Sequence, residues 1–358
     1  MKRFTFSLLG LCVCLLTIAA IVPPAAFDDL VGQAKLFTVY DGKLVVGGYF
    51  KSADRRPANN MALWDGAKWS TLKKGVDAIP KDLCVVGKDL YACGDWSYVD
   101  KEDNSKYVEA GQVAKWDGTK WSSLAKKNVV DQKVWCLATD GKNLYIGGRF
   151  TKVDDKLEAS NLAVWDGKKL SVLGNQKFQG DGGRGIGTIL AMAHHDGKLF
   201  VGGIFGTIGD EPASRVAYWD GKSWTEAGNK GLNNQVTLLK SDGKTLYAAG
   251  KFTAAGDGTP LKGVAKWDNG KWSPLGNDGL DDVTGLAIDG NTVYIANGQE
   301  VIKKWDGSSW SDLPAISMAN LYGVGVHNGV VYAGGEFNDG KFGGICKLVN
   351  GAWEAVSK

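Results

Sequence analysis

The chain of 358 residues carries 42 Lys and Arg against 39 Asp and Glu, a formal net charge of +3. This near balance excludes the strongly basic surface typical of nucleic-acid binding and gives no general attraction to an anionic membrane. Tryptophan (14) and glycine (50) are abundant, whereas only three histidines occur, so a histidine-based metal centre is not expected.

The first residues are typical of a secretory signal peptide. Met1-Lys2-Arg3 is basic, residues 4–22 are mostly apolar, and Pro23-Pro24-Ala25-Ala26 offers a cleavage region. We predict that residues 1–26 are removed and that the mature protein is secreted or extracytoplasmic, at the cell surface, in a periplasm or in a secretory lumen. The alternative is an uncleaved anchor, because the apolar run approaches spanning length, and only then would the protein contact a membrane.

The repeating unit is clearest at residues 236–275. Four short apolar runs, at 236–239, 246–249, 264–267 and 272–275, are separated by turn residues such as Asp-Gly and Asn-Gly. Asn and Gly tolerate the positive φ that a tight hairpin requires, and runs of four to eight residues favour strands over helices. One unit therefore predicts a four-stranded antiparallel meander, with strands A to D.

The same unit recurs along the chain. Trp-Asp-Gly begins at Trp64, Trp116, Trp165, Trp219 and Trp305, with Trp267-Asp268-Asn269-Gly270 as a variant and Val349-Asn350-Gly351 as the last copy. A period of about 40–50 residues with four strands per copy is typical of propellers. We predict one domain, 27–358, that is all-β and folds as a seven-bladed β-propeller of four-stranded antiparallel blades. The blades are expected at about 34–73, 80–125, 133–173, 188–228, 235–275, 283–313 and 320–358.

A double glycine and an aromatic residue end strand B, as in Gly47-Gly48-Tyr49-Phe50 and Gly147-Gly148-Arg149-Phe150. This order, followed by tryptophan, resembles the kelch repeat of the galactose-oxidase-like propeller superfamily. It also resembles the propellers of fungal cortical-marker-like and bacterial surface proteins. The resemblance covers about residues 34–358 and implies the fold, but propellers support binding, scaffolding and unrelated chemistries, so it does not imply one function.

The connections divide into two sets. The A–B and C–D turns are short, and we call the face that carries them the hairpin face. The B–C and D–A connections vary, and we call theirs the loop face. The B–C connections span 51–60, 97–111, 151–160, 206–214 and 253–262, with a truncated copy at Gln299-Glu300. Variable loops on a rigid scaffold commonly carry function, so a protein or glycan ligand is expected on the loop face.

Six unusual residues are candidates for that binding site. Trp135 begins the third inner strand, Trp96 replaces a phenylalanine after strand B of the second blade, and Tyr98 follows it. The arginines Arg55, Arg56 and Arg184 lie in nearby loops. Exposed aromatic and arginine side chains are enriched at recognition hot spots, although local loop packing also explains them.

No catalytic, metal-binding or cofactor-binding set is evident. His195 and His327 flank A–B turns, where we expect them in solvent, and the glycine run 180–187 lacks the helix N-terminus that holds a phosphate. We therefore predict a non-catalytic binding or adhesion module. The alternative is a secreted carbohydrate-active enzyme at the channel mouth, and two carboxylates facing each other at about 5–9.5 Å would favour it.

Four cysteines follow the signal segment. Cys84 and Cys93 flank the first hairpin of the second blade, and a turn centred near Lys88-Asp89 would place them opposite each other as a disulfide. If Gly87 lies in the turn instead, the register moves and the two separate. Small buried thiols are the alternative, and Cys136 and Cys346 have no evident partner.

Overall fold

The computed structural model describes residues 30–100, 107–126, 128–174, 177–183, 185–276, 280, 282–337 and 342–357. Strands dominate these residues, and the only helical element among them is a single 3₁₀ turn, η1 (Asp181–Gly183). None of the described residues belongs to a helix long and apolar enough to cross a membrane. The prediction of an all-β chain is confirmed.

Seven sheets in the described part contain a path of four antiparallel strands that follow the chain order. We number them sheets 1 to 7. Their first strands are β1 (Val31–Tyr40), β6 (Pro80–Val86), β12 (Lys133–Thr139), β19 (Thr188–His195), β25 (Val236–Ser241), β29 (Gly285–Asp289) and β33 (Met318–His327). Their second strands are β2 (Lys43–Ala53), β7 (Asp89–Gly94), β13 (Leu144–Arg149), β20 (Lys198–Ile204), β26 (Leu246–Gly250), β30 (Thr292–Ala296) and β34 (Val330–Phe337).

The outer strands are shorter. The third strands are β4 (Met61–Trp64), β10 (Val113–Trp116), β16 (Leu162–Trp165), β23 (Val216–Trp219), β27 (Val264–Asp268), β31 (Lys303–Trp305) and β35 (Ile345–Val349). The fourth strands are β5 (Trp69–Thr71), β11 (Trp121–Ser123), β17 (Leu170–Val172), β24 (Trp224–Glu226), β28 (Lys271–Pro274), β32 (Trp310–Asp312) and β36 (Ala352–Ala355). The four-stranded antiparallel meander expected from residues 236–275 is therefore present, as sheet 5.

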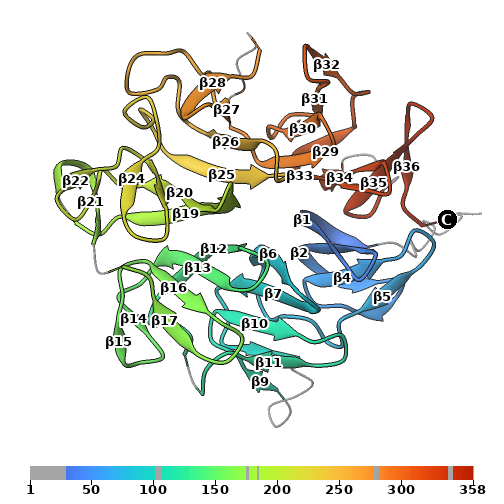
Figure 1. The fold of residues 1–358 in the computed structure, drawn as a ribbon. Helices are drawn as coiled ribbons and strands as arrows, with labels where there is room; N and C mark the ends of the chain where they lie inside the picture. Colours follow the sequence, from blue (N-terminus) through green and yellow to red (C-terminus); the bar gives the residue numbers. More distant parts are fainter. Residues whose placement is uncertain are drawn as a thin grey trace, which may run out of the picture.

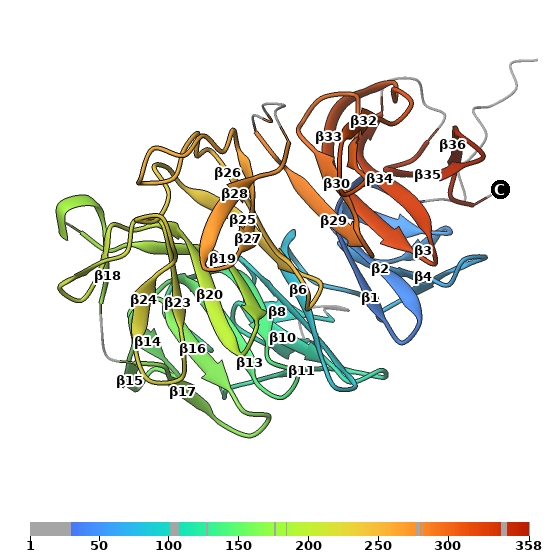
Figure 2. The same ribbon diagram turned by 45° about the horizontal axis from the view of Figure 1, so that its top comes forward.

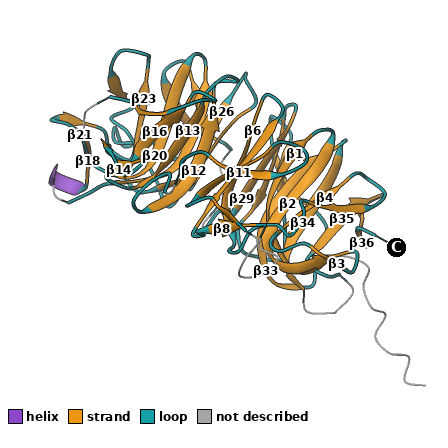
Figure 3. Ribbon diagram, turned by 90° about the horizontal axis from the view of Figure 1, so that it is seen from below, coloured by secondary structure: helices purple, strands orange, loops and turns teal. Residues whose placement is uncertain are grey.

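The sheets follow one another around a common centre, with the first strand of each sheet innermost (Figure 1). Each inner strand contacts the inner strands of its neighbours, and β1 contacts both β6 and β33. The first and last sheets are thus side by side, and the Ala34 amide donates a hydrogen bond to the Gly344 carbonyl, at 3.2 Å. In the oblique view of Figure 2 the sheets still surround the centre, and in the view turned by 90° the strands run across a flattened body (Figure 3). This arrangement is consistent with a β-propeller.

The core lies between neighbouring sheets rather than at one centre. Each of the seven clusters of buried apolar residues joins two adjacent sheets, including sheets 7 and 1. The repeated tryptophans belong to these clusters or pack against them, and the Trp64 and Trp69 rings lie 5.1 Å apart. On strand D, the indole N–H groups of Trp121 and Trp272 donate to the carbonyls of Leu72 and Ala227 in the preceding sheet. Tryptophan therefore supplies both apolar area and a link between sheets.

The double glycines make room for backbone. A Cβ at Gly48 would collide with the carbonyl oxygen of Gln33, and one at Gly47 would press on the ring of Pro80 in the next sheet. Opposite these glycines β1 has a register shift between Ala34 and Leu36. Similar shifts interrupt β6, β12, β19, β25 and β33. A bulge in the inner strand and a glycine in its partner thus occur together.

The hairpin face is built on one recurring turn. In sheet 1, Asp65 Oδ1 accepts hydrogen bonds from the Ala67 and Lys68 amides at 2.9 and 2.8 Å, and Trp64 pairs with Trp69. The same aspartate turn occurs at Asp117, Asp166, Asp220 and Asp306. Four residues separate the paired positions in these C–D turns, so they are longer than the tight hairpins expected from sequence. Both paired residues are tryptophan except in sheet 3, where Trp165 pairs with Leu170. A two-residue turn occurs where Asp268 pairs with Lys271.

The loop face carries short strands from the B–C connections. They comprise β3 (Arg56–Pro57), β8 (Tyr98–Val99), β9 (Val108–Glu109), β14 (Lys152–Val153), β15 (Leu157–Glu158), β21 (Thr207–Ile208) and β22 (Glu211–Pro212). One further strand, β18 (Phe178–Gln179), comes from the D–A connection into sheet 4 and pairs with β21. Two buried asparagines tie such loops to the following sheet. Asn60 accepts from the Phe50 amide and donates to the Val76 carbonyl, and Asn161 binds Phe150 and Gly187 in the same way. The variable loops therefore rest on a fixed base.

Candidate functional site

Bulges in six inner strands, and the residue before the seventh, mark equivalent positions around the central channel. The register shifts skip Lys35, Lys81, Trp135, Leu190, Thr237 and Tyr322, and Thr284 directly precedes β29. The inner strands start at the loop face, so these seven residues lie near the opening of the channel on that face. We call them the mouth ring. A bulge commonly redirects a side chain, and six of the seven line one cavity.

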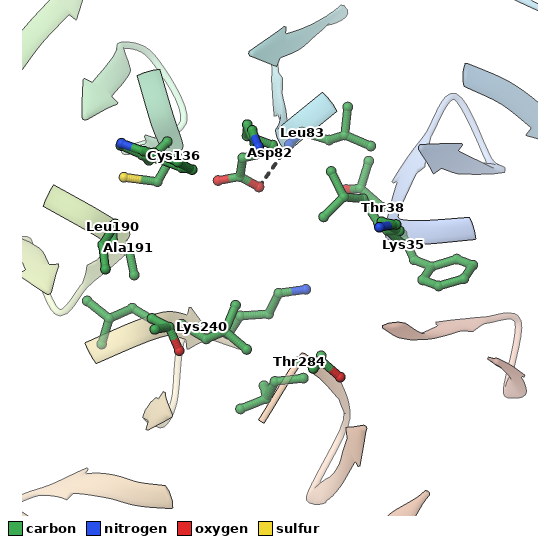
Figure 4. Close-up of a pocket in the computed structure, with 18 of the residues that line it drawn as sticks. Lys35, Thr38, Asp82, Leu83, Cys136, Leu190, Ala191, Lys240 and Thr284 are labelled. Atoms are coloured by element: carbon green, nitrogen blue, oxygen red, sulfur yellow. Dashed lines mark hydrogen bonds between the residues drawn. The ribbon is translucent and has the colours of Figure 1, made fainter. Parts of the chain in front are cut away.

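That cavity occupies the loop-face end of the channel and has a volume of about 250 Å³. Its walls come from the inner strands of all seven sheets, and Lys240 extends into its middle (Figure 4). Three lysines, Lys35, Lys81 and Lys240, line it together with one carboxylate, Asp82. The cavity therefore combines apolar walls with an excess of positive charge.

Trp135 is the large aromatic residue of the mouth ring. Its side chain is half-buried on β12, and the ammonium groups of Lys81 and Lys133 lie 5.0 and 5.8 Å from the centre of its ring. Lys81 also lies 4.0 Å from a carboxylate oxygen of Asp95. Cation–π contacts of this kind hold ammonium groups beside the indole, so Trp135 organises positive charge at the mouth as well as apolar area.

Asp82 lies one residue deeper than the mouth ring. Its Oδ1 accepts a hydrogen bond from the Leu83 amide, and its Oδ2 accepts one from the Leu137 amide of β12, both at 2.8 Å. Burial raises the pKa of Asp82 to about 6, although these hydrogen bonds and the charge of Lys240 act in the opposite direction. Asp82 thus joins sheets 2 and 3 through its carboxyl group, and the pKa of that group is raised.

Lys240 and Lys35 carry the remaining charge inside the channel. The Lys240 side chain reaches water in the channel, yet protein surrounds it, and this enclosure lowers the pKa of its ammonium group while Asp82 opposes the shift. Burial and the charge of Lys81 lower the pKa of Lys35. The Lys35 ammonium lies 4.1 Å from the centre of the Tyr322 ring. Two enclosed ammonium groups therefore face the same small space.

The six binding-site candidates that were predicted from the sequence do not lie together in the structure. Of the described ones, only Trp135 lines the central cavity. Tyr98 is half-buried on β8 with its ring 4.5 Å from that of Tyr107, and the exposed Arg55 and Arg56 lie on the B–C hairpin of sheet 1. Arg56 pairs with Asp54 at 3.5 Å. Arg184 lies outside the described residues.

The expectation that Trp96 is exposed is corrected. Its side chain is 3% exposed and belongs to the cluster between sheets 1 and 2. Phe50, Phe150, Phe205 and Phe252 occupy the equivalent place two residues after a glycine, and all of them are buried. The ring folds back onto Gly94, where a Cβ would collide with it. Trp96 therefore fills the core as those phenylalanines do and offers no binding surface.

The disulfide between Cys84 and Cys93 is not formed. Val86 pairs with Asp89, which places Gly87 in the turn, and Cys84 then faces Tyr91 while Cys93 faces Asp82. Both are free, buried thiols, as is Cys136, and Cys346 is buried as well. Burial raises the pKa of the Cys84 and Cys93 thiols, so they behave as apolar core residues. The register alternative, with Gly87 in the turn, is the one adopted.

The histidines also differ from expectation, because His195 and His327 are buried rather than solvated, at 8% and 4% exposure. Nδ1 of His195 lies 2.9 Å from the Ser241 hydroxyl. Burial lowers the pKa of both imidazoles. Within the described ranges, no group of three or more His, Cys, Asp or Glu side chains could hold a metal ion.

Sequence reasoning missed Asp82, Lys35, Lys81 and Lys240. Asp82 occupies a place where the other inner strands have Leu36, Cys136, Ala191, Leu238, Gly285 and Gly323. Lys240 occupies one where they have Thr38, Cys84, Ala138, Ala193, Ala287 and Gly325. Aligning the inner strands from the mouth ring would have exposed both as the charged exceptions.

The comparisons with known proteins show the fold alone. The GH74 enzyme of Niastella koreensis is similar in structure, with a TM-score of 0.54 at 14% identity over 92% of this chain and 55% of that chain. Two structures of an extracellular domain from B. thetaiotaomicron, described as belonging to a one component and a hybrid two component system, each have a TM-score of 0.53 at 10% identity. They match 89% and 90% of this chain, which spans only 39% of theirs. No protein-family model matches the chain, and no curated protein is similar to it in sequence.

Proposed function

We propose that this protein is a secreted or surface-exposed seven-bladed β-propeller that binds a protein or glycan ligand through its loop face. The seven four-stranded sheets and the contact between sheets 1 and 7 support the blade count. The signal-like start and the extracellular domains among the similar structures support the location. The double glycines and repeated tryptophans support a kelch-type relationship.

The residues that line the central cavity favour a binding function over a catalytic one. Among its lining residues Asp82 is the single carboxylate, and its two oxygens already accept backbone hydrogen bonds. Hydrolysis of a glycosidic bond needs two carboxyl groups, one on each side of the bond. A half-exposed tryptophan beside lysines favours recognition. The alternative, a secreted carbohydrate-active enzyme, requires a second carboxylate facing Asp82.

The decisive experiment is a ligand screen with the mature protein, using a glycan array and a pull-down, followed by variants. Trp135→Ala should weaken binding of the ligand found by about tenfold, the loss expected for one hot spot. Lys222→Ala, on the C–D turn of sheet 4 at the hairpin face, is the control and should leave affinity unchanged. Loss of binding with Lys222→Ala but not with Trp135→Ala would show that the face is wrongly assigned.

Export is tested on its own. Protein recovered from the native host should begin near Phe27 and occur in the extracytoplasmic soluble fraction. Recovery of chains that retain Met1 in a membrane fraction would instead indicate a signal anchor.

A further inference from the structure

The central cavity has more cationic than anionic groups. No carboxylate of a described residue lies within ion-pair distance (4.0 Å) of the Lys240 or Lys35 ammonium, and Lys81 reaches Asp95 only at 4.0 Å. Asp82 is the one acidic side chain that lines the space. One carboxylate carries a single negative charge, so Asp82 cannot neutralise three lysines.

Lys240 is the least expected of these charges. At the equivalent point in four other inner strands stand Ala138, Ala193, Ala287 and Gly325. Lys240 is thus the one charged residue at this level of the channel, and Figure 4 shows its side chain extending into the cavity. Ammonium groups gathered in one cavity without an ion-pair partner repel one another, and clusters of charged groups in a cleft are typical of binding sites.

We propose that the cavity binds the acid group of an acidic sugar, with a carboxylate or sulfate held among Lys35, Lys81 and Lys240. The inference deepens the proposed function, since it uses the same cavity and names its ligand class. Ammonium groups form strong charge-assisted hydrogen bonds to carboxylate and sulfate oxygens. The half-buried indole of Trp135, beside Lys81, offers an apolar face to a sugar ring.

The size of the cavity limits what enters it. A volume of about 250 Å³ accommodates an acid group with a single sugar ring and no bulky substituents. The site therefore suits a terminal acidic sugar or the acid group of one residue in a longer chain, with the remainder lying over the loop face.

The test is isothermal titration of the mature protein with sodium D-glucuronate, with inorganic sulfate and with neutral D-glucose. Glucuronate should bind and glucose should not. Lys240→Met keeps the length and apolar stem of the side chain but removes the charge, and should weaken glucuronate binding by at least about tenfold, as expected for loss of one charge-assisted contact. Lys244→Met, on the A–B turn of the same sheet, is the matched control and should leave affinity unchanged.

Each outcome decides a separate point. Glucuronate binding tighter than sulfate binding identifies an acidic sugar, whereas equal binding that depends on Lys240 would show that a free anion suffices and would reject the sugar. Absence of binding to either anion, or binding that Lys240→Met leaves unchanged, would overturn the anion site altogether. Because the Trp135→Ala test uses the ligand from the unbiased screen, the proposed function survives that result if Trp135→Ala still weakens ligand capture.

Discussion

On the hairpin face, five sheets repeat one turn in which an aspartate oxygen accepts two backbone hydrogen bonds. On the loop face, the equivalent positions of the mouth ring carry lysine, tryptophan, leucine, threonine and tyrosine. The same repeat builds both faces. The turn aspartates serve the backbone of their own hairpin, whereas six of the seven mouth-ring residues line one shared cavity. Local geometry is thus uniform on one face, and chemical variety is concentrated on the other.

Both faces rest on the tryptophan-containing interfaces between sheets, so a substitution there should have the largest effect and should destabilise both faces. Trp64 is 1% exposed in the cluster between sheets 7 and 1. Trp64→Ala should lower the free energy of unfolding by about 3–5 kcal/mol, because a buried tryptophan leaves a cavity. Urea denaturation measures this loss. Trp305→Ala, at a half-buried equivalent site, should lower the free energy of unfolding by less. An equal loss would show that burial of the tryptophan does not determine how much each interface contributes to stability.

The carboxyl group of Asp82 in the channel should make the protein less stable as the pH rises. The pKa of Asp82 is about 6 in the folded protein and about 4 in an unfolded chain, so the folded state holds a proton that the unfolded state has lost. Stability should therefore fall as pH rises from about 4 to 6, by an amount on the order of 1–2 kcal/mol, since the site is partly open to water. Buried His195 and His327, with lowered pKa values, act in the opposite direction.

Comparing the pH dependence of stability between the parent protein and a variant without the Asp82 carboxyl group isolates its contribution. Thermal unfolding of Asp82→Asn at pH 4, 5, 6 and 7 should lack the component of slope that the parent protein shows. Asp95→Asn, at the exposed rim beside Lys81, is the control and should keep it. Parallel curves for the parent and Asp82→Asn would contradict a raised pKa at this site.

The hairpin face should show the smallest effect, with the opposite sign. Backbone hydrogen bonds from Lys120 and hydrogen bonds from Thr119 lower the pKa of the exposed Asp117 to about 2. Its contribution to stability is therefore present above about pH 4 and is lost as pH falls toward 2. Asp117→Ala should slightly lower Tm at pH 7 but not at pH 2. Asp268→Ala is the matched control, because Asp268 occupies the equivalent position in sheet 5 but no described group donates a hydrogen bond to its carboxylate. This variant should change Tm at neither pH.

The sequence by itself determined the repeat, the strands and the role of the tryptophans. Asp-Gly and Asn-Gly turns, the double glycines and the Trp-Asp pairs act over a few residues, and each copy repeats them. Sequence could also have placed Trp96 correctly, because Phe50 and Phe150 occupy its position in other copies. The position that Trp96 shares with these buried residues, and not its identity as tryptophan, decides its burial.

Only the tertiary structure decided which side chains meet in the channel. Lys35, Asp82 and Lys240 come from three sheets, and no local signal brings them together. Their direction depends on strand bulges, and a shift of one residue turns a side chain to the other face of a sheet. The same rule separated Cys84 from Cys93, because Gly87 rather than Lys88-Asp89 sets the turn. Register follows from where each turn lies, whereas the arrangement of the sheets around one centre involves the whole described chain, and the central cavity depends on both.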